Sequence, residues 1–227
     1  MPAEADLARP HLRGTLDSRL PYAVNPCLSC RGTCCHERVR VLLVEAVRMT
    51  AVLGLPIRSV VNAVPYEEAV DRAFRCVPLN LSGGPTLLTM RQTEGSEGHC
   101  VMVLKVGDRM LCGIYGLRPA VCRLFPYTVE ADGEVLSVGG FRHCPVRWTY
   151  VAETLTHLRH SVDALRADLE LEDRVVAAWE ASGPTERSLE ALVDHARPAV
   201  LAAAGVDPRQ VAGPSIPATV KLGRPLW

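Results

Sequence analysis

The stretch Cys27-Leu-Ser-Cys30-Arg-Gly-Thr-Cys34-Cys35-His36 places four thiols within nine residues. Two cysteines separated by two residues can direct both sulfurs toward one ion, because a tight turn brings their Cβ atoms together. This spacing is a common half-site for zinc and iron. Four more cysteines lie at or near expected turns or element ends: Cys100, Cys112, Cys122 and Cys144. Eight thiols in two clusters predict that the fold brings both segments to a metal centre.

Cys34 and Cys35 are adjacent, and consecutive side chains in extended structure point to opposite faces. Both thiols therefore seldom fit one tetrahedral ion. Two arrangements stay open: two neighbouring sites, or one cluster with the second thiol beside it. The ninth cysteine, Cys76, lies outside both clusters, and we expect it to be a buried small hydrophobe.

The overall composition argues against several classes of protein. The 227 residues include 25 Lys and Arg against 25 Asp and Glu, so the net charge is zero. The chain therefore lacks the excess of positive charge that is typical of nucleic-acid-binding proteins. No stretch approaches the roughly 20 apolar residues of a membrane span, and the charged N-terminus is unlike a secretory signal. We therefore expect a cytoplasmic protein that binds neither nucleic acid nor membrane. In a reducing cytoplasm, clustered cysteines are typical of metal ligands or redox groups.

The pattern along the chain predicts an α+β fold with a small, loop-rich cysteine-cluster core, short β-hairpins and packed C-terminal helices. We expect an N-terminal arm at 1–26, a metal-binding domain at 27–146, a helical extension packed on it at 147–204, and a tail at 205–227. The change at about residue 147 reflects a switch from turn-rich sequence to helical periodicity.

Several elements of the cysteine-cluster core can be predicted locally. We expect a strand at 39–43 and a helix at 44–53 that ends at Gly54, followed by a less regular region broken at 82–85. One hairpin should join 100–106 to 109–112, and a second should join 127–130 to 134–138. Pro119 fits the start of a short helix that carries Cys122.

The first predicted hairpin constrains two of the cysteines. A two-residue turn at Gly107-Asp108 pairs Cys112 with Val103, which leaves Cys100 about 10 Å away along the strand. Either the strand bends before Cys100, or the two cysteines serve different sites.

The C-terminal region has the periodicity of amphipathic helices. Its first apolar stripe consists of Val151, Leu155, Leu158, Val162, Leu165 and Leu169. The phase changes near Glu170, so we predict that one helix ends there and a second carries Leu171, Val175 and Trp179 as far as Gly183-Pro184. A third helix should span about 186–197 and be disturbed by Pro198.

The segment Cys-Gly-Ile-Tyr-Gly-Leu-Arg-Pro-Ala-Val-Cys-Arg-Leu-Phe-Pro, from Cys112 to Pro126, resembles the signature of the YkgJ-type cysteine-cluster family. The resemblance extends over roughly residues 27 to 145 through Gly98-His99-Cys100-Val101 and the first cluster. One difference is that three residues separate Cys30 from the vicinal pair, where the family has two. The signature residues are Cys112, Ile114, Tyr115, Arg118, Pro119, Cys122, Arg123, Phe125 and Pro126.

The resemblance implies a domain that chelates zinc or iron, with the eight clustered cysteines as its ligands. A distant relative, the flagellin lysine methylase, is described as using an iron-sulfur cluster with S-adenosylmethionine. The expected function is therefore a metal-binding protein that holds zinc or an iron-sulfur cluster. The alternatives are an iron-sulfur enzyme that modifies a protein substrate, and a metal-free thiol redox switch. Catalysis and a protein partner are left open.

Other side chains near the cysteines have secondary roles in this hypothesis. Arg118 and Arg123 flank Cys122, and we expect them to donate hydrogen bonds to thiolates. Each of three histidines adjoins a cysteine and is expected to lie beside the ligands rather than among them: His36, His99 and His143. Tyr115 and Phe125 are expected in the core. Four acidic residues are expected to be solvated or capping: Glu45, Glu170, Glu172 and Asp173.

Overall fold

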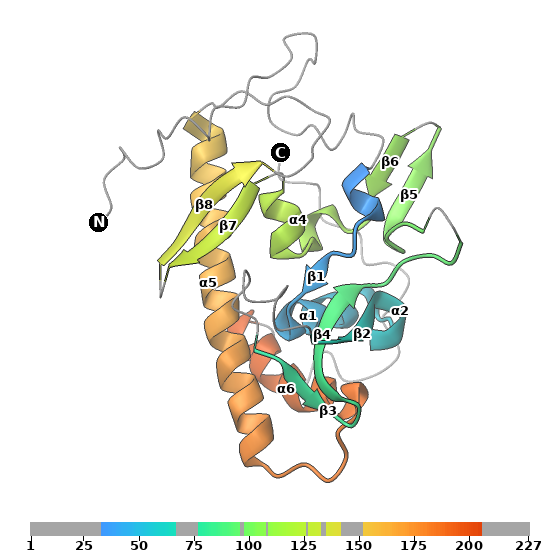
Figure 1. Cartoon of the computed structure of the whole chain (residues 1–227), viewed down its shortest axis with the longest axis vertical. Helices are drawn as coiled ribbons and strands as arrows, with labels where there is room; N and C mark the ends of the chain where they lie inside the picture. Colours follow the sequence, from blue (N-terminus) through green and yellow to red (C-terminus); the bar gives the residue numbers. More distant parts are fainter. Residues whose placement is uncertain are drawn as a thin grey trace.

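The computed structural model describes residues 33–66, 77–95, 98–107, 109–125, 127–132, 135–141 and 152–205. Within these ranges the protein combines helices with antiparallel strands, which confirms the α+β class. Figure 1 shows the long helix α5 (Ala152–Ala181) along one side of the molecule. The main sheet and helices α1 (Leu43–Leu53) and α6 (Leu189–Ala203) lie beside its lower half. Of the two β-hairpins in the upper part of the molecule, one lies beside α5 and the other lies on the opposite side.

The main sheet is built around β4 (Gly84–Met90). The strand β2 (Val61–Pro65) pairs with one side of β4, while β1 (Arg40–Val41) and β3 (Leu79–Leu81) pair with its other side. All three pairings are antiparallel. The prediction of a less regular region after Gly54 was therefore wrong. The strands β1 and β2 pair with β4 across long stretches of chain and leave little local signal, whereas β3 and β4 are joined by a two-residue turn at Ser82-Gly83, within the predicted break.

Helix α1 agrees with the prediction and supplies much of the core. It ends at Gly54, whose φ of 65° lies in the left-handed region that favours glycine, and the Gly54 N–H donates to the Thr50 carbonyl. The preceding strand is shorter than expected, because helical structure already begins at Leu43. The short helix α2 (Ile57–Val60) then leads into β2.

Both predicted hairpins are present. The first joins β5 (Val103–Val106) to β6 (Arg109–Cys112), with Val103 opposite Cys112 as the two-residue turn requires. The second joins β7 (Tyr127–Asp132) to β8 (Val135–Phe141). Between the hairpins lie a 3-10 turn, η5 (Tyr115–Leu117), and the short helix α4 (Ala120–Leu124), which begins after Pro119 as predicted.

The C-terminal helices differ from the prediction in two respects. The helix α5 runs without a break from Ala152 to Ala181, so the predicted end near Glu170 was wrong. The stripe that faces the core passes through Asp168 and Glu172, which are both buried. These two carboxylates interrupt the apolar periodicity of the sequence, so their turn of the helix resembles a change of phase. The helix α6 also continues past Pro198 to Ala203, farther than the predicted end at 197.

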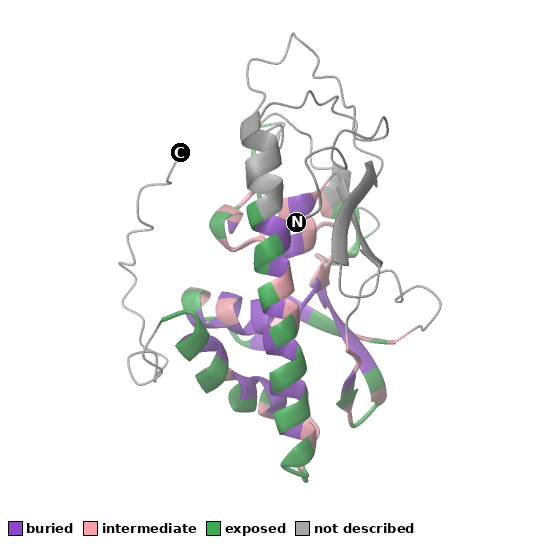
Figure 2. Cartoon of the chain, turned by 90° about the vertical axis from the view of Figure 1, so that its left-hand side faces the viewer, coloured by how far each residue is buried: buried purple, intermediate pink, exposed green. Residues whose placement is uncertain are grey.

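A single aliphatic core joins the N-terminal helix and sheet to the C-terminal helices. It contains residues from β1, α1, β4, α4, α5 and α6. Figure 2 shows that buried residues line the inner sides of the helices, while their outer sides are exposed. Among the described helices, none is long and apolar enough to cross a membrane.

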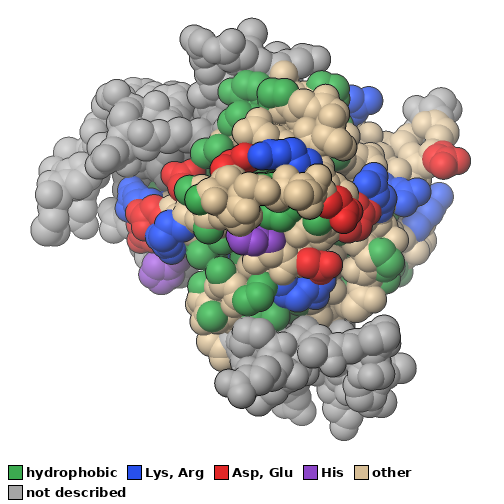
Figure 3. Space-filling model, turned by 90° about the horizontal axis from the view of Figure 1, so that it is seen from below, with side chains coloured by type: hydrophobic (Ala, Val, Ile, Leu, Met, Phe, Trp, Pro, Cys, Tyr) green, Lys and Arg blue, Asp and Glu red, His purple; other side chains and the backbone are tan. Residues whose placement is uncertain are grey.

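The surface at the α6 and β3 end carries both signs of charge. Figure 3 shows acidic and basic side chains interspersed on this face rather than gathered by sign. Two ion pairs lie in this part of the molecule: Arg187–Glu180, at 2.9 Å, and Arg58–Glu190. Such pairs are consistent with a net charge of zero.

The difference in burial between core and surface leucines predicts different effects of their substitution on stability. Leu192 of α6 is 1% exposed, whereas Leu104 of β5 is 57% exposed. We expect Leu192→Ala to lower the free energy of unfolding by about 2–5 kcal/mol, because it removes buried surface and leaves a cavity. The matched control Leu104→Ala should change it by less than about 0.5 kcal/mol. Urea denaturation measures both values, and equal losses would contradict the assigned core.

Candidate metal centre

The first cysteine cluster is described only in its last part. Cys34 and Cys35 lie in a 3-10 turn, η4 (Thr33–His36), where only the backbone of Cys34 is described. Cys35 is a half-buried free thiol. Cys27, Cys30, Cys76 and Cys144 lie outside the described residues, as do His143 and the predicted arm and tail.

The two cysteine-bearing stretches meet at Cys35 and Cys100. The Cys100 N–H donates to the Cys35 carbonyl oxygen at 2.8 Å, although 65 positions separate the two residues. Gln92 Nε2 donates to the His36 carbonyl at 2.8 Å, and His36 Nδ1 lies 3.1 Å from the Gly98 carbonyl oxygen. Figure 1 shows η4 beside the β5–β6 hairpin. The fold therefore brings the end of the first cluster against the start of the second.

The position of Cys100 resolves the conflict in the hairpin prediction. Strand β5 begins at Val103, and the Val103 N–H donates to the Cys100 carbonyl at 3.0 Å, so the chain turns between these residues. Cys100 instead forms an isolated antiparallel bridge with Gln92. The strand thus bends before Cys100, which was the first of the two alternatives. Cys100 and Cys112 are both partly buried and pack against the core.

A glycine permits the close packing beside Cys112. The Gly113 N–H donates to the Met102 carbonyl at 2.8 Å. A Cβ atom at position 113 would lie 3.1 Å from that same carbonyl oxygen and 3.2 Å from Leu104. Few real Cβ contacts are this short, so a side chain would push the turn before β5 away from the end of β6.

Cys122 lies on α4, which is anchored by a buried carboxylate from another helix. The Ala120 N–H, at the start of α4, donates to Glu45 Oε1 at 2.6 Å. The other carboxylate oxygen of Glu45 accepts from the Leu42 N–H at 3.1 Å, at the start of α1. One side chain therefore satisfies backbone donors at two helix N-termini and fixes α4 relative to α1.

Arg123, the neighbour of Cys122, completes a charged network inside the protein. Its Nη2 atom lies 3.8 Å from Glu45 Oε1 and 4.0 Å from Asp168 Oδ2. Arg48 Nη1 lies 2.6 Å from Asp168 Oδ1, so Asp168 of α5 contacts two guanidinium groups. In the described contacts, Arg123 thus pairs with buried carboxylates rather than surface ones. Its Nε–H is buried and has no hydrogen-bond partner within the described part of the chain.

Arg118 takes a different position. Its guanidinium carbon lies 3.7 Å from the centre of the Tyr115 ring, which is a cation–π geometry. Arg118 Nε also donates to the Tyr115 carbonyl at 3.2 Å. Tyr115 and Phe125 are half-buried, so the prediction that they belong to the core was only partly right.

Burial raises the pKa of two carboxyl groups in this network. Desolvation raises the pKa of Glu45 to about 7, against hydrogen bonds from Leu42 and Ala120 that lower it. Desolvation likewise raises the pKa of Glu172 to about 8, although the Val44 N–H donates to its Oε2 atom at 3.2 Å. Both carboxyl groups accept hydrogen bonds at helix N-termini. Of the two predicted alternatives, capping or solvated, the first therefore holds, because neither group is exposed to solvent.

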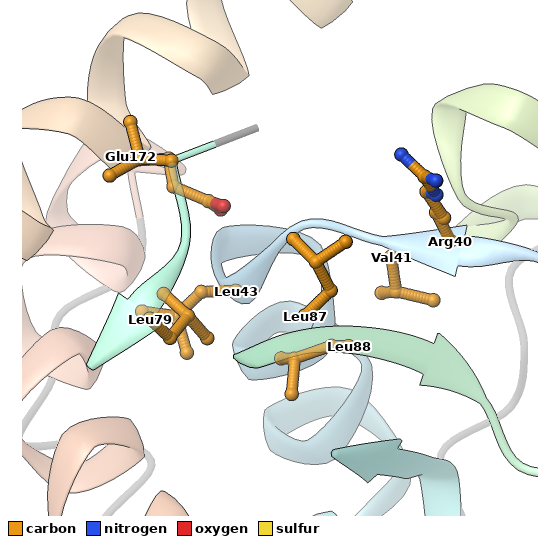
Figure 4. Close-up of a pocket in the computed structure, with 8 residues that line it drawn as sticks. Arg40, Val41, Leu43, Leu79, Leu87, Leu88 and Glu172 are labelled. Carbon is orange, nitrogen blue, oxygen red and sulfur yellow. The ribbon is translucent and has the colours of Figure 1, made fainter. Parts of the chain in front are cut away.

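Glu172 also borders a small cavity. Figure 4 shows this cavity, with Glu172 and Arg40 among its lining residues and apolar side chains between them. The cavity has a volume of about 10 Å³, enough for roughly one water molecule. Glu172 is 4% exposed, so its charged form has little access to bulk solvent.

Two histidines lie where the cysteine stretches meet. The rings of His36 and His99 are in edge contact, with centroids 6.1 Å apart. His99 is tied to Thr93, whose hydroxyl accepts from the His99 N–H at 3.1 Å. In the part of the chain that the structure describes, no three His, Cys, Asp or Glu side chains are grouped to hold one metal ion. Cys35, Cys100, Cys112 and Cys122 therefore belong to the predicted ligand set without forming a complete site by themselves.

Comparison with known proteins identifies the cysteine region. The family model CxxCxxCC, described as "Putative zinc- or iron-chelating domain", matches residues 26–144, just over half of the chain. The chain belongs to this family. That agrees with the YkgJ-type resemblance and supports metal binding, with zinc or iron as the metal. No curated protein and no solved structure matches the chain.

The CxxCxxCC signature residues include Arg123 but not its carboxylate partners. Sequence reasoning missed Glu45 and Asp168 as partners of Arg123, and Glu172 as a buried acceptor at the start of α1. A signal was present in α5, where Leu165, Asp168, Glu172, Val175 and Trp179 follow one another at spacings of three and four. Extending the helical stripe through polar residues would have found two of the three carboxylates.

The raised pKa of Glu172 predicts a pH-dependent stability. Between the ordinary value of 4.5 and about 8, the folded state binds more protons than the unfolded state. The free energy of unfolding should therefore fall as the pH rises through this window. Glu172→Gln should remove part of this slope and leave the variant more stable than the wild type at pH 8.5, by about 1 kcal/mol or more, since one pKa unit corresponds to a free energy of this order.

Urea denaturation at a series of pH values from about 5 to 8.5 measures the effect. The matched control is Glu170→Gln, since Glu170 lies two positions earlier on α5 and is exposed. This control should keep the wild-type slope. Parallel curves for Glu172→Gln and the wild type would contradict the assignment.

Proposed function

We propose that the chain is a metal-binding protein that holds zinc or an iron-sulfur cluster through cysteines of both stretches, and that it works in the cytoplasm. The observation that carries this proposal is the 2.8 Å hydrogen bond from the Cys100 N–H to the Cys35 carbonyl. This hydrogen bond holds the backbones of the two cysteine stretches together, so that ligand side chains from both stretches can start from fixed positions. The family match supports the same chemistry.

The donor set suits zinc or iron. Thiolates are soft ligands that favour zinc and iron-sulfur clusters over magnesium or calcium. A centre with four thiolates carries excess negative charge, which nearby hydrogen-bond donors offset. The Nε–H of Arg123, next to Cys122 in the chain, is buried without a hydrogen-bond partner in the described part of the chain, and we propose it as such a donor.

The residues around the cysteines support a centre built on a rigid base. Glu45 fixes the start of α4, the β5–β6 pairing fixes Cys112, and the turn at Cys100 packs against the core. Ligands held on packed elements bind a metal more tightly than ligands on free loops, because less ordering is needed on binding. A cytoplasmic location would keep the thiols reduced and available.

Metal analysis of the protein purified without oxygen tests the proposal. We expect at least about one zinc or iron atom per chain, since structural thiolate sites bind with large apparent free energies. A colourless protein with zinc would indicate a mononuclear centre, and a brown protein with absorbance near ~400 nm would indicate an iron-sulfur cluster. Cys35→Ser and Cys112→Ser, one from each stretch, should each lower the metal content by half or more.

Cys76→Ser is the matched control, because Cys76 lies outside both clusters in the sequence, and it should leave the metal content unchanged. A metal content near zero in the wild type would overturn the proposal. If all the thiols then reacted rapidly with a thiol reagent, and chelators made no difference, a thiol redox switch would replace it.

A further inference from the structure

An arginine-lined groove lies at the edge of the main sheet. It has a volume of about 550 Å³ and is lined by residues of β2, the end of β4, and three arginines: Arg38, Arg58 and Arg91. No described acidic side chain lines it. A groove of this size exceeds what a single inorganic anion fills and falls in the range that holds a short peptide or a small organic ligand.

The three arginines differ in what they already bind. Arg58 pairs with Glu190, and its Nη2 atom donates to Glu190 Oε2 at 3.0 Å. Arg91 Nη1 donates to the Arg58 carbonyl at 2.8 Å and keeps its charge unpaired among the described contacts. Arg38 is exposed and makes no ion pair within the described part of the chain. Within the described part of the chain, the groove therefore has two positive charges without an acidic partner.

The strand β2 adds backbone groups to the same groove. Among the described strands its only neighbour is β4, so its other side is an edge of the sheet. The Arg91 N–H donates to the Val60 carbonyl, and because antiparallel pairs alternate, Asn62 and Val64 face β4 while Ala63 faces away. Ala63 thus presents its N–H and C=O on the open side, and Pro65 limits how far a pairing can extend.

We infer that this groove binds an extended acidic segment of a protein partner. Carboxylates of the segment lie against Arg38 and Arg91, and its backbone pairs with Ala63 at the edge of β2. Guanidinium groups bind carboxylates through paired hydrogen bonds, and an exposed strand edge can accept an added strand. The apolar residues Val64 and Leu189 line the groove between these polar groups.

A peptide fits the groove better than a nucleic acid does. No described aromatic side chain lines it, so the stacking platforms of single-strand binding are missing there. The chain's own C-terminal segment at 206–227 is also disfavoured by charge, because Asp207 is outnumbered by Arg209, Lys221 and Arg224. The acidic pair Glu67-Glu68, which follows β2 closely, is the competing occupant from the same chain.

Fluorescence anisotropy with a labelled decapeptide of alternating Thr and Glu tests the inference on the full chain. The peptide should bind saturably and more weakly as salt is added, and Arg38→Ala combined with Arg91→Ala should weaken binding tenfold or more. Arg174→Ala is the matched control, because Arg174 is exposed on α5 away from the groove, and it should leave binding unchanged. A peptide N-methylated at alternate residues should also bind more weakly, since it lacks donors for the strand edge.

The outcomes separate this inference from its competitors and from the metal proposal. Absence of saturable binding up to about 1 mM, or equal binding by the double arginine variant, would overturn it. Tighter binding of an oligo-dT decamer, or of a Thr-Lys peptide, would also overturn it. A gain in affinity on Glu67→Gln with Glu68→Gln would show that the chain's own segment fills the groove. Unchanged metal content and circular dichroism in the arginine variants would show that folding and the metal centre are intact.

Discussion

The carboxylate of Glu45 is the interaction on which the arrangement of the candidate site depends. It accepts hydrogen bonds from the N-termini of α1 and α4, and it lies within ion-pair distance of Arg123. Through Arg123 and Arg48 the network extends to Asp168 on α5. Three helices that are distant in sequence are thus joined by directional bonds where apolar packing alone would allow them to slide. Cys122 takes its position from this junction.

Burying such a charged network costs free energy, and this cost suggests that the network has a role other than stabilising the fold. Burying a carboxylate is unfavourable unless hydrogen bonds and opposite charges compensate, and replacing a buried ion pair with apolar groups is often neutral or stabilising. The raised pKa values of Glu45 and Glu172, both caused mainly by desolvation, indicate that compensation here is incomplete. Stability alone would therefore not require these groups. Their hydrogen bonds to helix starts fix one geometry, which is what a helix that carries a candidate metal ligand requires.

The parts of the fold that could be predicted are those with local causes. Gly54 ends α1 because few other residues adopt its backbone angle readily, and the two-residue turn after Val106 sets the register of the β5–β6 hairpin. Most of the main sheet could not be predicted, because β1 and β2 pair with β4 across long stretches of chain and the strand order depends on packing. The local pairing of β3 with β4 has only the two-residue turn at Ser82-Gly83 as its signal, and in sequence that turn indicates no more than a break. The same limit applies to the site. The sequence indicated that two cysteine clusters converge, but the contact between Cys35 and Cys100 needed the bend before Val103, which the simple hairpin pattern does not contain.

The division between scaffold and candidate centre follows from where the core lies. The buried core residues include members of α1, the main sheet, α4, α5 and α6, and the described cysteines are at most partly buried beside them. Aliphatic packing can therefore fold most of the described chain without a metal, unlike a zinc finger, whose binding energy is its folding energy. A metal would instead order the cysteine-bearing turns at one end of a domain that is already folded. This separation lets the cysteine turns change with little cost to the core. The arginine-lined β2 edge adjoins these turns through Gln92, which lines the groove and donates to the His36 carbonyl, but it is built on the main sheet and can serve a different task.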